Sequence, residues 1–452
     1  VGSHRMSAAP VPCGPKGPPL VGHLFAFRRD PLAFLSRIAR DYPGDVVRFR
    51  PGPRDVYLVK HPDLIKDVLV TRQHDFSKSR GLEWAKLFLG EGLLTSEGEF
   101  HTRQRRLAQP AFHRQRVGAY ADDMVRRTVR ARGGWSAGQV LDVDGEMMRL
   151  TLAVVSSSLF GTDVAASADE VREDLASIIA LFPRFSLPLF GLIQKLPLPS
   201  NVRFDRAVAR LDALVYRLIA ERQGDGRDHG DLLSMLLLAR DEEGGGRMTD
   251  RQLRDEVITL LLAGHETTSN ALTWTWYLLS QNEEVEGRWR DELRRVLGGR
   301  APTFEDLPAL PYTEMVLAES MRLFPPAWGM GRRALRDVTL GGFTIHQGAI
   351  LALSPFIVHR DERFWPDPLR FDPGRFTAEA KAARPRFAYF PFGAGARSCI
   401  GEPFAWMEGV LLLATIGQRW RLRLLPGHPV ELKALMTLRP RYGMRMVAEP
   451  AG

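Results

Sequence analysis

The chain has 452 residues, of which 44% are hydrophobic and 25% charged, and its formal net charge is +9. This composition is ordinary for a folded globular protein and excludes wholesale disorder, collagen-like repeats and a bundle of membrane helices. Because the positive charges are interspersed with acidic residues and no nucleic-acid-binding motif occurs, we expect no nucleic acid partner, whereas an acidic protein partner would suit so basic a chain.

The cysteine count and the start of the chain bear on its location. Cys13 and Cys399 are the two cysteines, too few for a disulfide framework or a zinc ribbon, which favours a reducing, cytoplasmic setting. Residues 1–6 have the character of an expression scar, and no signal segment or long apolar span follows them. We therefore expect residues 7–452 to form a single domain with no transmembrane anchor.

The first part of the chain predicts a small β region. The stretch from Pro10 to Pro19 is rich in proline and glycine and is incompatible with a helix. Two short runs follow, 46–49 and 56–59, with Pro51-Gly52-Pro53 between them. Runs of this kind around a turn predict a β-hairpin.

Helical periodicity dominates the next part of the chain. From residue 61 to about residue 280, apolar residues return at intervals of three and four, with polar connectors such as 224–231 and 242–246. Later runs separated by glycines predict strands at 338–340, 343–345, 350–353, 420–425 and 436–447. Without an internal repeat or a long linker, we expect one mainly α body with a smaller β-rich lobe formed by both ends of the chain, near 44–60, 338–354 and 420–447.

One long helix should start after Thr249, because Thr249 and Gln252 have capping-box spacing. Its centre reads Ala263-Gly264-His265-Glu266-Thr267-Thr268 and lies between apolar stretches. One interpretation is a bend caused by hydroxyl groups that donate to helix carbonyls. The other is functional, with the glycine letting a ligand approach the backbone while Glu266 and Thr267 pass protons.

The most informative stretch runs from Phe390 to Gly401 and reads FPFGAGARSCIG. A helical pattern follows, so Cys399 should lie at a helix N-terminus, where unpaired N–H groups and the helix dipole favour a thiolate. Glycines at 393, 395 and 401 allow a tight loop, and Arg397 is placed to meet an anionic cofactor edge. For a lone cysteine, the alternative is a buried structural residue.

The order F-G-x-G-x-R-x-C-x-G from Phe392 to Gly401 resembles the haem-binding loop of the cytochrome P450 family at every fixed position. Glu319-Ser320-Met321-Arg322 and the stretch around Glu266 match two further family motifs in the expected order. The resemblance implies a soluble, bacterial-type chain with the cytochrome P450 fold, in which haem lies between the long central helix and the cysteine loop. It also implies a buried cluster of Glu319, Arg322 and Arg375 without a part in the chemistry.

The same resemblance implies heme b as the cofactor and Cys399 as its iron ligand. Further cofactor contacts are expected from both halves of the sequence: Phe392, Gly393, Ala263, His101, Arg105, Arg397 and Arg332. His101 and Arg105 are four residues apart on one predicted helical face, which suits contact with the propionates. Arg333, adjacent to Arg332, leaves that register open, and for each of these cations a surface position is the alternative.

A thiolate ligand pushes electron density into haem iron and favours cleavage of the O–O bond of O2. The family uses a threonine and its neighbouring acid to protonate bound dioxygen, which implies that Thr267 and Glu266 are catalytic. The implied activity is a monooxygenase that hydroxylates or epoxidises a hydrophobic substrate. No flavin, nicotinamide or iron–sulfur motif occurs in the sequence, so electrons from NAD(P)H should arrive through a separate ferredoxin or flavodoxin and its reductase.

Several apolar segments should select the substrate, namely 76–94, 181–199, the helix face near Ala263, 326–330 and 435–437. They suggest a fatty acid, terpenoid, steroid or polyketide, and we expect a monomer. Two other functions stay open. A haem-thiolate peroxygenase would use H2O2 without a redox partner, but its relatives replace the acid and hydroxyl pair that Glu266 and Thr267 provide. A noncatalytic haem-binding sensor would need the cysteine loop and not that pair.

Overall fold

The computed structural model describes residues 11–161, 168–181, 184, 190–241 and 246–451. Outside the described residues lie 1–10, 162–167, 182–183, 185–189, 242–245 and 452. These include the predicted expression scar, part of the predicted substrate segment 181–199 and most of the predicted connector 242–246. The chain divides into two compact units. Unit 1 comprises Val1–Glu83, Trp328–Leu369 and Ala383–Ser398, and unit 2 comprises Trp84–Ala327, Arg370–Ala382 and Cys399–Gly452.

Unit 1 is built on a five-stranded sheet in the order β1-β2-β8-β5-β3, with a separate hairpin of β6 and β7. Its strands are β1 (Val46–Phe49), β2 (Val56–Val59), β3 (Phe76–Lys78), β5 (Met330–Ala334), β6 (Val338–Leu340), β7 (Phe343–Ile345) and β8 (Ile350–Leu353). Its helices are α1 (Leu24–Arg29), α2 (Pro31–Asp41), α3 (Pro62–Lys66) and α16 (Pro355–Val358), and α4 (Arg80–Leu89) continues into unit 2.

The hairpin predicted at the start of the chain is confirmed, because β1 and β2 pair antiparallel with Val46 opposite Val59. All four residues of β2 are buried, as expected of a strand with both faces covered. β8 joins β2 in parallel and β5 in antiparallel register. Phe390, at the start of the cysteine loop, is buried in the apolar core of this unit.

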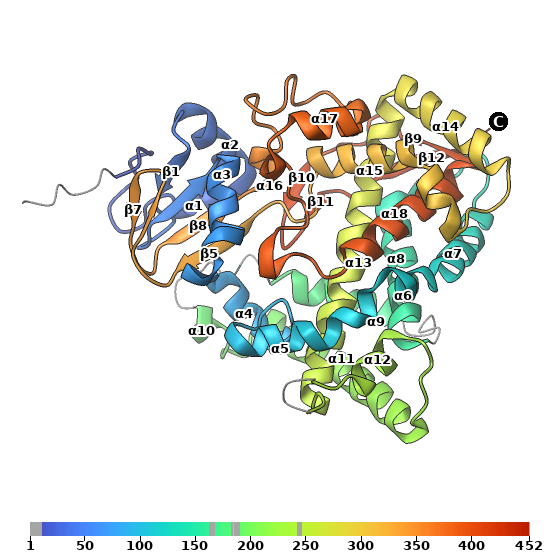
Figure 1. Ribbon diagram of the computed structural model, residues 1–452, viewed down its shortest axis with the longest axis horizontal. Coiled ribbons are helices and arrows are strands. Elements are labelled where there is room, and N and C mark those ends of the chain that lie inside the picture. Colours follow the sequence, from blue (N-terminus) through green and yellow to red (C-terminus); the bar gives the residue numbers. More distant parts are fainter. Residues whose placement is uncertain (1–10, 162–167, 182–183, 185–189, 242–245, 452) are drawn as a thin grey trace, which may run out of the picture. The chain divides into compact units, whose positions relative to one another are not determined.

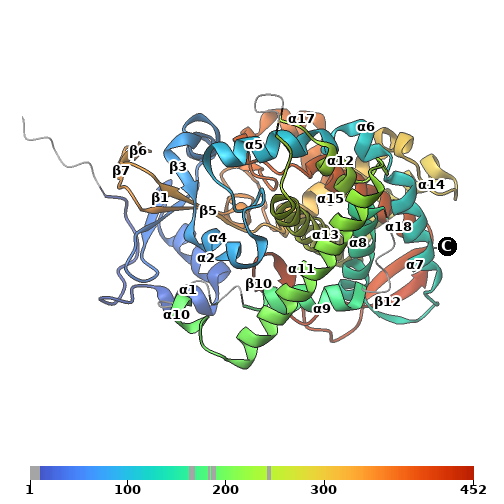
Figure 2. The same cartoon turned by 90° about the horizontal axis from the view of Figure 1, so that it is seen from below.

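Unit 2 is mainly helical (Figures 1 and 2). Its helices are α5 (Gly98–Ala108), α6 (Arg114–Gly118), α7 (Ala121–Gly133), α8 (Val143–Phe160), α9 (Ala168–Ile179), α10 (Phe190–Ile193), α11 (Pro199–Asp225), α12 (Leu232–Leu238), α13 (Asp250–Gln281), α14 (Glu283–Leu297), α15 (Pro311–Leu323), α17 (Ala378–Ala383) and α18 (Glu402–Gly417). Its strands are β4 (Val140–Asp142), β9 (Trp420–Leu424), β10 (Leu432–Ala434), β11 (Leu438–Pro440) and β12 (Arg445–Pro450).

The long helix α13 is the centre of unit 2 and packs against α8, α11, α15 and α18. It starts with the predicted capping box, in which the side chains of Thr249 and Gln252 each bind the other's backbone N–H. A Cβ on Gly264 would lie 2.8 Å from Cγ2 of Val155 in α8. Gly264 therefore lets α8 approach α13 closely, a packing role that the sequence did not predict. None of the helices that the structure describes is long and apolar enough to cross a membrane.

The strands differ from the sequence-based expectation in two ways. The predicted run 436–447 is broken into β11 and β12, with Gly443 at a φ of 68° between them. The expectation that both ends of the chain form one β lobe is wrong, because β12 pairs with β4 on one side and with β9 on the other in a sheet of unit 2. β3 and β4, three residues each, are too short to interrupt a helical periodicity, so the sequence did not reveal them.

Candidate cofactor site

The loop that precedes Cys399 is held by backbone contacts within unit 1. Gly395 has a φ of 70°, and a Cβ at this position would lie 2.0 Å from the carbonyl oxygen of Leu69. No side chain fits there, which explains this glycine. The next residue, Ala396, donates its backbone N–H to Oε1 of Gln73 at 2.9 Å.

The start of the same loop is tied to a buried histidine. The backbone N–H of Phe390 donates to Nε2 of His359 at 3.0 Å, and His359 is fully buried. Gly393 has a φ of 69° and donates its N–H to the carbonyl of Phe390 at 3.0 Å. The tight, glycine-dependent loop that the sequence predicts is therefore present, with Phe392 and Gly393 in its first turn.

Arg332 and Arg333 have different partners in the structure. Both lie in β5, where successive side chains point to opposite faces of the sheet. Arg333 forms an ion pair with Glu83 at 3.2 Å and donates to Oγ of Ser77 at 3.3 Å. Arg332 instead donates to the carbonyl oxygen of Gly331 at 3.1 Å. Arg397 ends the 3-10 turn Gly395–Arg397, also within unit 1.

Cys399 lies two residues before Gly401, the N-cap of α18, so the predicted position at a helix N-terminus is confirmed. Cys399 is an exposed residue. The protein atoms packed around its thiol nevertheless desolvate it, and this burial raises the pKa of the thiol to about 11. The backbone N–H groups of Gly401 and Glu402 and the charge of Arg105 lower this pKa, as expected, but desolvation outweighs them. Because a metal binds the thiolate, iron ligation would release the thiol proton.

The predicted propionate contacts His101 and Arg105 lie in α5. His101 is buried and its Nδ1 lies 3.2 Å from Oγ of Ser96. Burial lowers the pKa of Arg105, and the nearby Cys399 opposes this effect. Arg105 and Cys399 therefore interact electrostatically within unit 2.

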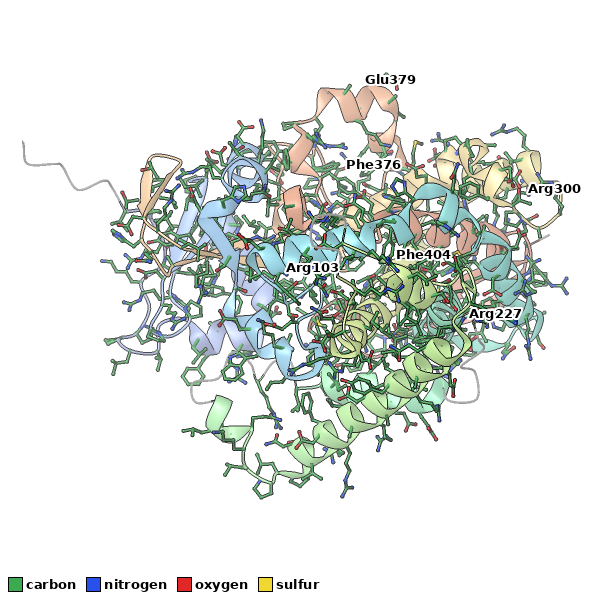
Figure 3. All side chains as sticks on the ribbon, turned by 60° about the horizontal axis from the view of Figure 1, so that its bottom comes forward. Arg103, Arg227, Arg300, Phe376, Glu379 and Phe404 are labelled. Carbon is green, nitrogen blue, oxygen red and sulfur yellow. The ribbon has the colours of Figure 1, made fainter. Side chains whose placement is uncertain are left out.

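The neighbouring arginines of α5 have different partners. Arg103 and Arg106 both form ion pairs with Asp241, at 3.0 and 2.8 Å. Arg103 is labelled in Figure 3, together with Arg227 and Arg300, which belong to other segments of unit 2. These cations are spread over separate elements, as the interspersed charges of the sequence suggested.

The middle of α13 exposes a short stretch of an otherwise buried helix. Ala263 is exposed and Thr267 half-buried, whereas Leu262 and Thr268 are buried. Oγ1 of Thr267 donates to the carbonyl of Ala263 at 2.7 Å. The hydroxyl group thus donates to a helix carbonyl, as in the interpretation of this stretch as a helix bend. Its oxygen still has lone pairs that can accept a hydrogen bond from a ligand.

Glu266 points away from solvent, with 1% of its surface exposed. Its Oε1 accepts from Oγ1 of Thr437 at 2.5 Å and from Nε of Arg439 at 2.7 Å. Thr437 and Arg439 were not predicted as site residues, although the segment 435–437 was predicted to contact substrate. A buried charge needs partners, but nothing in the sequence identified Arg439 as the partner of Glu266.

The supporting cluster predicted from the E-x-x-R motif is confirmed. Arg322 donates to both carboxylate oxygens of Glu319, at 2.6 and 2.8 Å, and both side chains are fully buried. Arg375 lies 3.4 Å from Glu319, and the backbone N–H of Asp372 donates to the same carboxylate at 2.9 Å. Burial raises the pKa of Glu319, and the charge and hydrogen bonds of Arg322 oppose it.

A second buried acid, Glu408 in α18, was missed by the sequence analysis. Burial raises its pKa to about 8, while the hydroxyl of Thr268 in α13 opposes the rise. Its signal would have been a carboxylate in the middle of an apolar helical run, with no lysine or arginine at helical spacing to pair with it.

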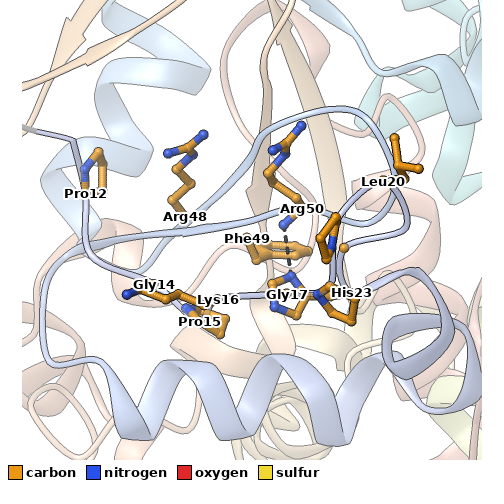
Figure 4. A pocket seen from close by; sticks show the side chains of 14 residues that line it. Pro12, Gly14, Pro15, Lys16, Gly17, Leu20, His23, Arg48, Phe49 and Arg50 are labelled. Carbon is orange, nitrogen blue, oxygen red and sulfur yellow. Dashed lines mark hydrogen bonds between the residues drawn. The ribbon is translucent and has the colours of Figure 1, made fainter.

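Unit 1 also contains a cavity of about 410 Å³, lined by the proline-rich leader and β1 (Figure 4). Its polar lining includes Lys16, His23, Arg48 and Arg50, and the backbone N–H of Arg50 donates to Nδ1 of His23 at 3.2 Å. None of the predicted site residues lines this cavity.

The residues of unit 2 fit a flat, anionic cofactor that carries a thiolate-bound metal. Cys399 supplies a thiol on an exposed residue, and Ala263 with Thr267 supply an accessible patch of helix. His101 and Arg105 add hydrogen-bond donors and positive charge for acidic groups of the cofactor. One sulfur ligand, an apolar helix face and nearby cations are the donor set expected for haem with propionates.

Comparisons with known proteins agree with this donor set. A family model described as Cytochrome P450 matches residues 12–445. The crystal structure of the cytochrome P450DA heme domain superimposes with a TM-score of 0.89 and 28% sequence identity, over 98% of this chain and 98% of that one.

Curated relatives cover nearly the whole chain. Cyclooctatin synthase of Streptomyces melanosporofaciens is 43% identical over 96% of this chain and 95% of its own length. Cyclooctat-9-en-7-ol 5-monooxygenase of the same organism is 42% identical over 91% of this chain and 90% of its own length. Pentalenene oxygenase of Streptomyces avermitilis is 36% identical over 97% of both chains.

Proposed function

The chain belongs to the cytochrome P450 family and is a monooxygenase, and on that premise we propose that it hydroxylates or epoxidises a terpenoid. The observation that carries this proposal is the kind of relative it has. Cyclooctat-9-en-7-ol and pentalenene, named in two of the relatives, are polycyclic terpenoids. Identities of 36 to 43% over at least 91% of the chain support the same class over the fatty acids, steroids and polyketides that the sequence left open.

Heme b is the proposed cofactor, with Cys399 as the ligand of its iron. The residues proposed to hold it further are His101, Arg105, Ala263, Arg332, Phe392, Gly393 and Arg397. Haem with a thiolate ligand supplies the activation of O2. In this proposal, protein N–H groups around the sulfur keep the ligand anionic, and the cations of α5 neutralise the propionates.

Glu266 and Thr267 are the proposed catalytic residues, and their task is to deliver protons. Thr267 is half-buried on the accessible patch of α13, so its hydroxyl can reach a bound ligand. Glu266 is buried next to it in the sequence and is bound by Arg439. An acid held inside the protein, one residue from an accessible hydroxyl, is the arrangement needed to pass protons without admitting bulk water.

Electrons are proposed to come from NAD(P)H through a separate ferredoxin or flavodoxin and its reductase. The net charge of +9 supports an acidic partner of this kind, because complementary charge speeds association. We further propose that the chain is a single domain over residues 7–452 that works as a monomer in the cytoplasm.

The two other haem-thiolate functions that the sequence left open do not require the acid that α13 provides. A peroxygenase that takes H2O2 has no need of a proton-delivering acid, and a haem-binding sensor needs no substrate site. The buried Glu266, with its carboxylate bound by Arg439 and Thr437, favours the monooxygenase over both. Burying a carboxyl group costs free energy, and Thr437 and Arg439 offset part of this cost for Glu266.

The test is a binding and turnover screen of the haem-loaded protein. Polycyclic terpenes and terpene alcohols are compared with fatty acids, steroids and polyketides through the change in the haem absorption spectrum on binding. Compounds that bind are then turned over with a ferredoxin, its reductase and NAD(P)H. We expect oxygenated product from terpenoids at micromolar concentrations and weak or no spectral change from the other classes.

A parallel reaction with H2O2 and no reductase is the control for mechanism. Product in the reductase reaction that depends on O2 supports the monooxygenase. Product formed with peroxide alone would instead identify a peroxygenase, and tight binding of a non-terpenoid class with efficient turnover would refute the proposed substrate.

A further inference from the structure

Glu266 is bound through only one of its two carboxylate oxygens. Oε1 accepts hydrogen bonds from Thr437 and Arg439, whereas Oε2 is buried and has no hydrogen-bond partner among the residues that the structure describes. Buried carboxylates normally have partners for both oxygens. One oxygen therefore fixes the side chain, and the other is left to take and give a proton.

A second acid, Asp144, is influenced by the charge of the same arginine that binds Glu266. Asp144 lies in the first turn of α8 and is half-buried, and its Oδ1 is a buried atom without a hydrogen-bond partner within the described parts of the chain. Burial raises the pKa of Asp144 to about 6, and the charges of Asp142 and Glu266 add to the rise, while Arg439 opposes it. An acid with this pKa is both protonated and ionised at measurable levels near neutral pH.

Three elements bring these groups together within unit 2. Asp144 comes from α8, Glu266 from α13, and Arg439 from β11, and α8 packs directly against α13 (Figure 1). The side chain of Arg439 is 19% exposed, against 1% for Glu266. The cluster thus extends from the sealed interior of α13 towards solvent.

Arg439 itself does not carry protons, because a guanidinium stays protonated throughout the pH range of proteins. Its Nε donates to Oε1 of Glu266 at 2.7 Å and so fixes the position of that carboxyl group. The positive charge of Arg439 limits the rise in the pKa of Asp144. A single cation therefore binds Glu266 and acts electrostatically on Asp144.

We propose that Asp144 and Arg439 form the solvent-side end of the proton route to Glu266, with Asp144 exchanging protons with water and Arg439 acting as the positioning residue of the Glu266 carboxylate. This inference rests on the proposed function, which assigns proton delivery to Glu266. In each passage, protonated Asp144 gives its proton through a water molecule to Oε2 of Glu266 and becomes a carboxylate. Asp144 then regains a proton from bulk water, and Glu266 passes its proton on towards Thr267, so that both acids return to their starting forms.

The first test measures the acids directly and needs no turnover. Infrared difference titration of the substrate-free protein follows the carbonyl band of protonated carboxyl groups as the pH changes. We expect a band with a midpoint near pH 6 that is absent from Asp144→Asn. The midpoint should rise by about one unit or more in Arg439→Gln, which removes a positive charge, and fall in Glu266→Gln, which removes a negative one.

Arg441→Gln is the matched control. Arg441 follows β11 by one residue and forms an exposed ion pair with Glu431 at 3.2 Å, so its loss changes the charge of the same region without touching the cluster. This variant should leave the midpoint unchanged. Asp144→Glu keeps the acid and should retain a titrating band. Haem content and thermal unfolding confirm that each variant is folded.

The second test measures how many of the supplied electrons reach product, and the solvent isotope effect on product formation in D2O. Asp144→Asn and Arg439→Gln should each lower the yield per electron several-fold and increase the isotope effect, while Arg441→Gln should change neither. Asp144→Glu should restore most of the yield.

The outcomes separate this inference from the proposed function. If Glu266→Gln loses yield but Asp144→Asn and Arg439→Gln do not, or if the infrared band survives in Asp144→Asn, the proposed route is refuted and the function stands. If Glu266→Gln also keeps its full yield, Glu266 delivers no protons, and both the catalytic assignment and the route to it are refuted.

Discussion

Glu408 offers a quantitative test of how the core of unit 2 responds to pH. Its side chain is fully buried in α18, and burial raises its pKa from the ordinary value of 4.5 to about 8. The folded protein therefore holds a proton on Glu408 that the unfolded chain releases at neutral pH. The stability that Glu408 contributes is fully present below about pH 4.5 and is lost as the pH rises to about 8.

The size of the effect follows from the pKa difference. Each unit of pKa difference corresponds to about 1.4 kcal/mol, so between about pH 5 and about pH 8 the free energy of unfolding should fall by roughly 4 kcal/mol through this group. Glu408→Gln removes the titration while keeping the shape of the side chain. The variant should gain stability over the parent as the pH rises.

The assay is urea denaturation of the parent and of Glu408→Gln at about pH 5 and about pH 8, where the difference between the two proteins cancels all other titrating groups. Glu379→Gln is the control, because Glu379 is exposed on α17 (Figure 3). We expect the two test proteins to diverge by several kcal/mol at the higher pH. Parallel pH dependence of parent and variant would refute the argument that a buried, protonated Glu408 limits stability.

Three further changes test the site and its support. Thr267→Ala should keep haem but divert electrons from product to peroxide or water, and an unchanged product yield per electron would contradict its role in proton delivery. Cys399→Ser should lose the red-shifted band of the ferrous carbon monoxide complex, and its persistence would show that another atom holds the iron. Arg322→Met leaves Glu319 buried with fewer partners and should lower the free energy of unfolding by about 3 to 5 kcal/mol. Denaturation measures this loss, with the exposed Arg294→Met as the control. A loss under about 1 kcal/mol would refute the supporting role of the pair.

Local motifs explain why much of the candidate site could be predicted. The stretch from Phe392 to Gly401 needs glycine where the backbone has positive φ and a cysteine just before a helix, and both requirements are written in adjacent residues. The capping box at Thr249 and the pair of Glu319 and Arg322 also depend on spacings of three residues. Interactions between neighbours in the sequence leave a pattern that can be recognised before folding.

What the sequence by itself determined is therefore the glycine-rich cysteine loop, the acid and hydroxyl of α13 and the mainly helical fold. The tertiary structure alone decided which partners those groups receive. Arg439 binds Glu266 from 173 residues away, and β12 pairs with β4 rather than with the first strands of the chain. Such contacts depend on which elements pack together. The same packing removes water from around Cys399, Asp144 and Glu408, and this burial raises their pKa values.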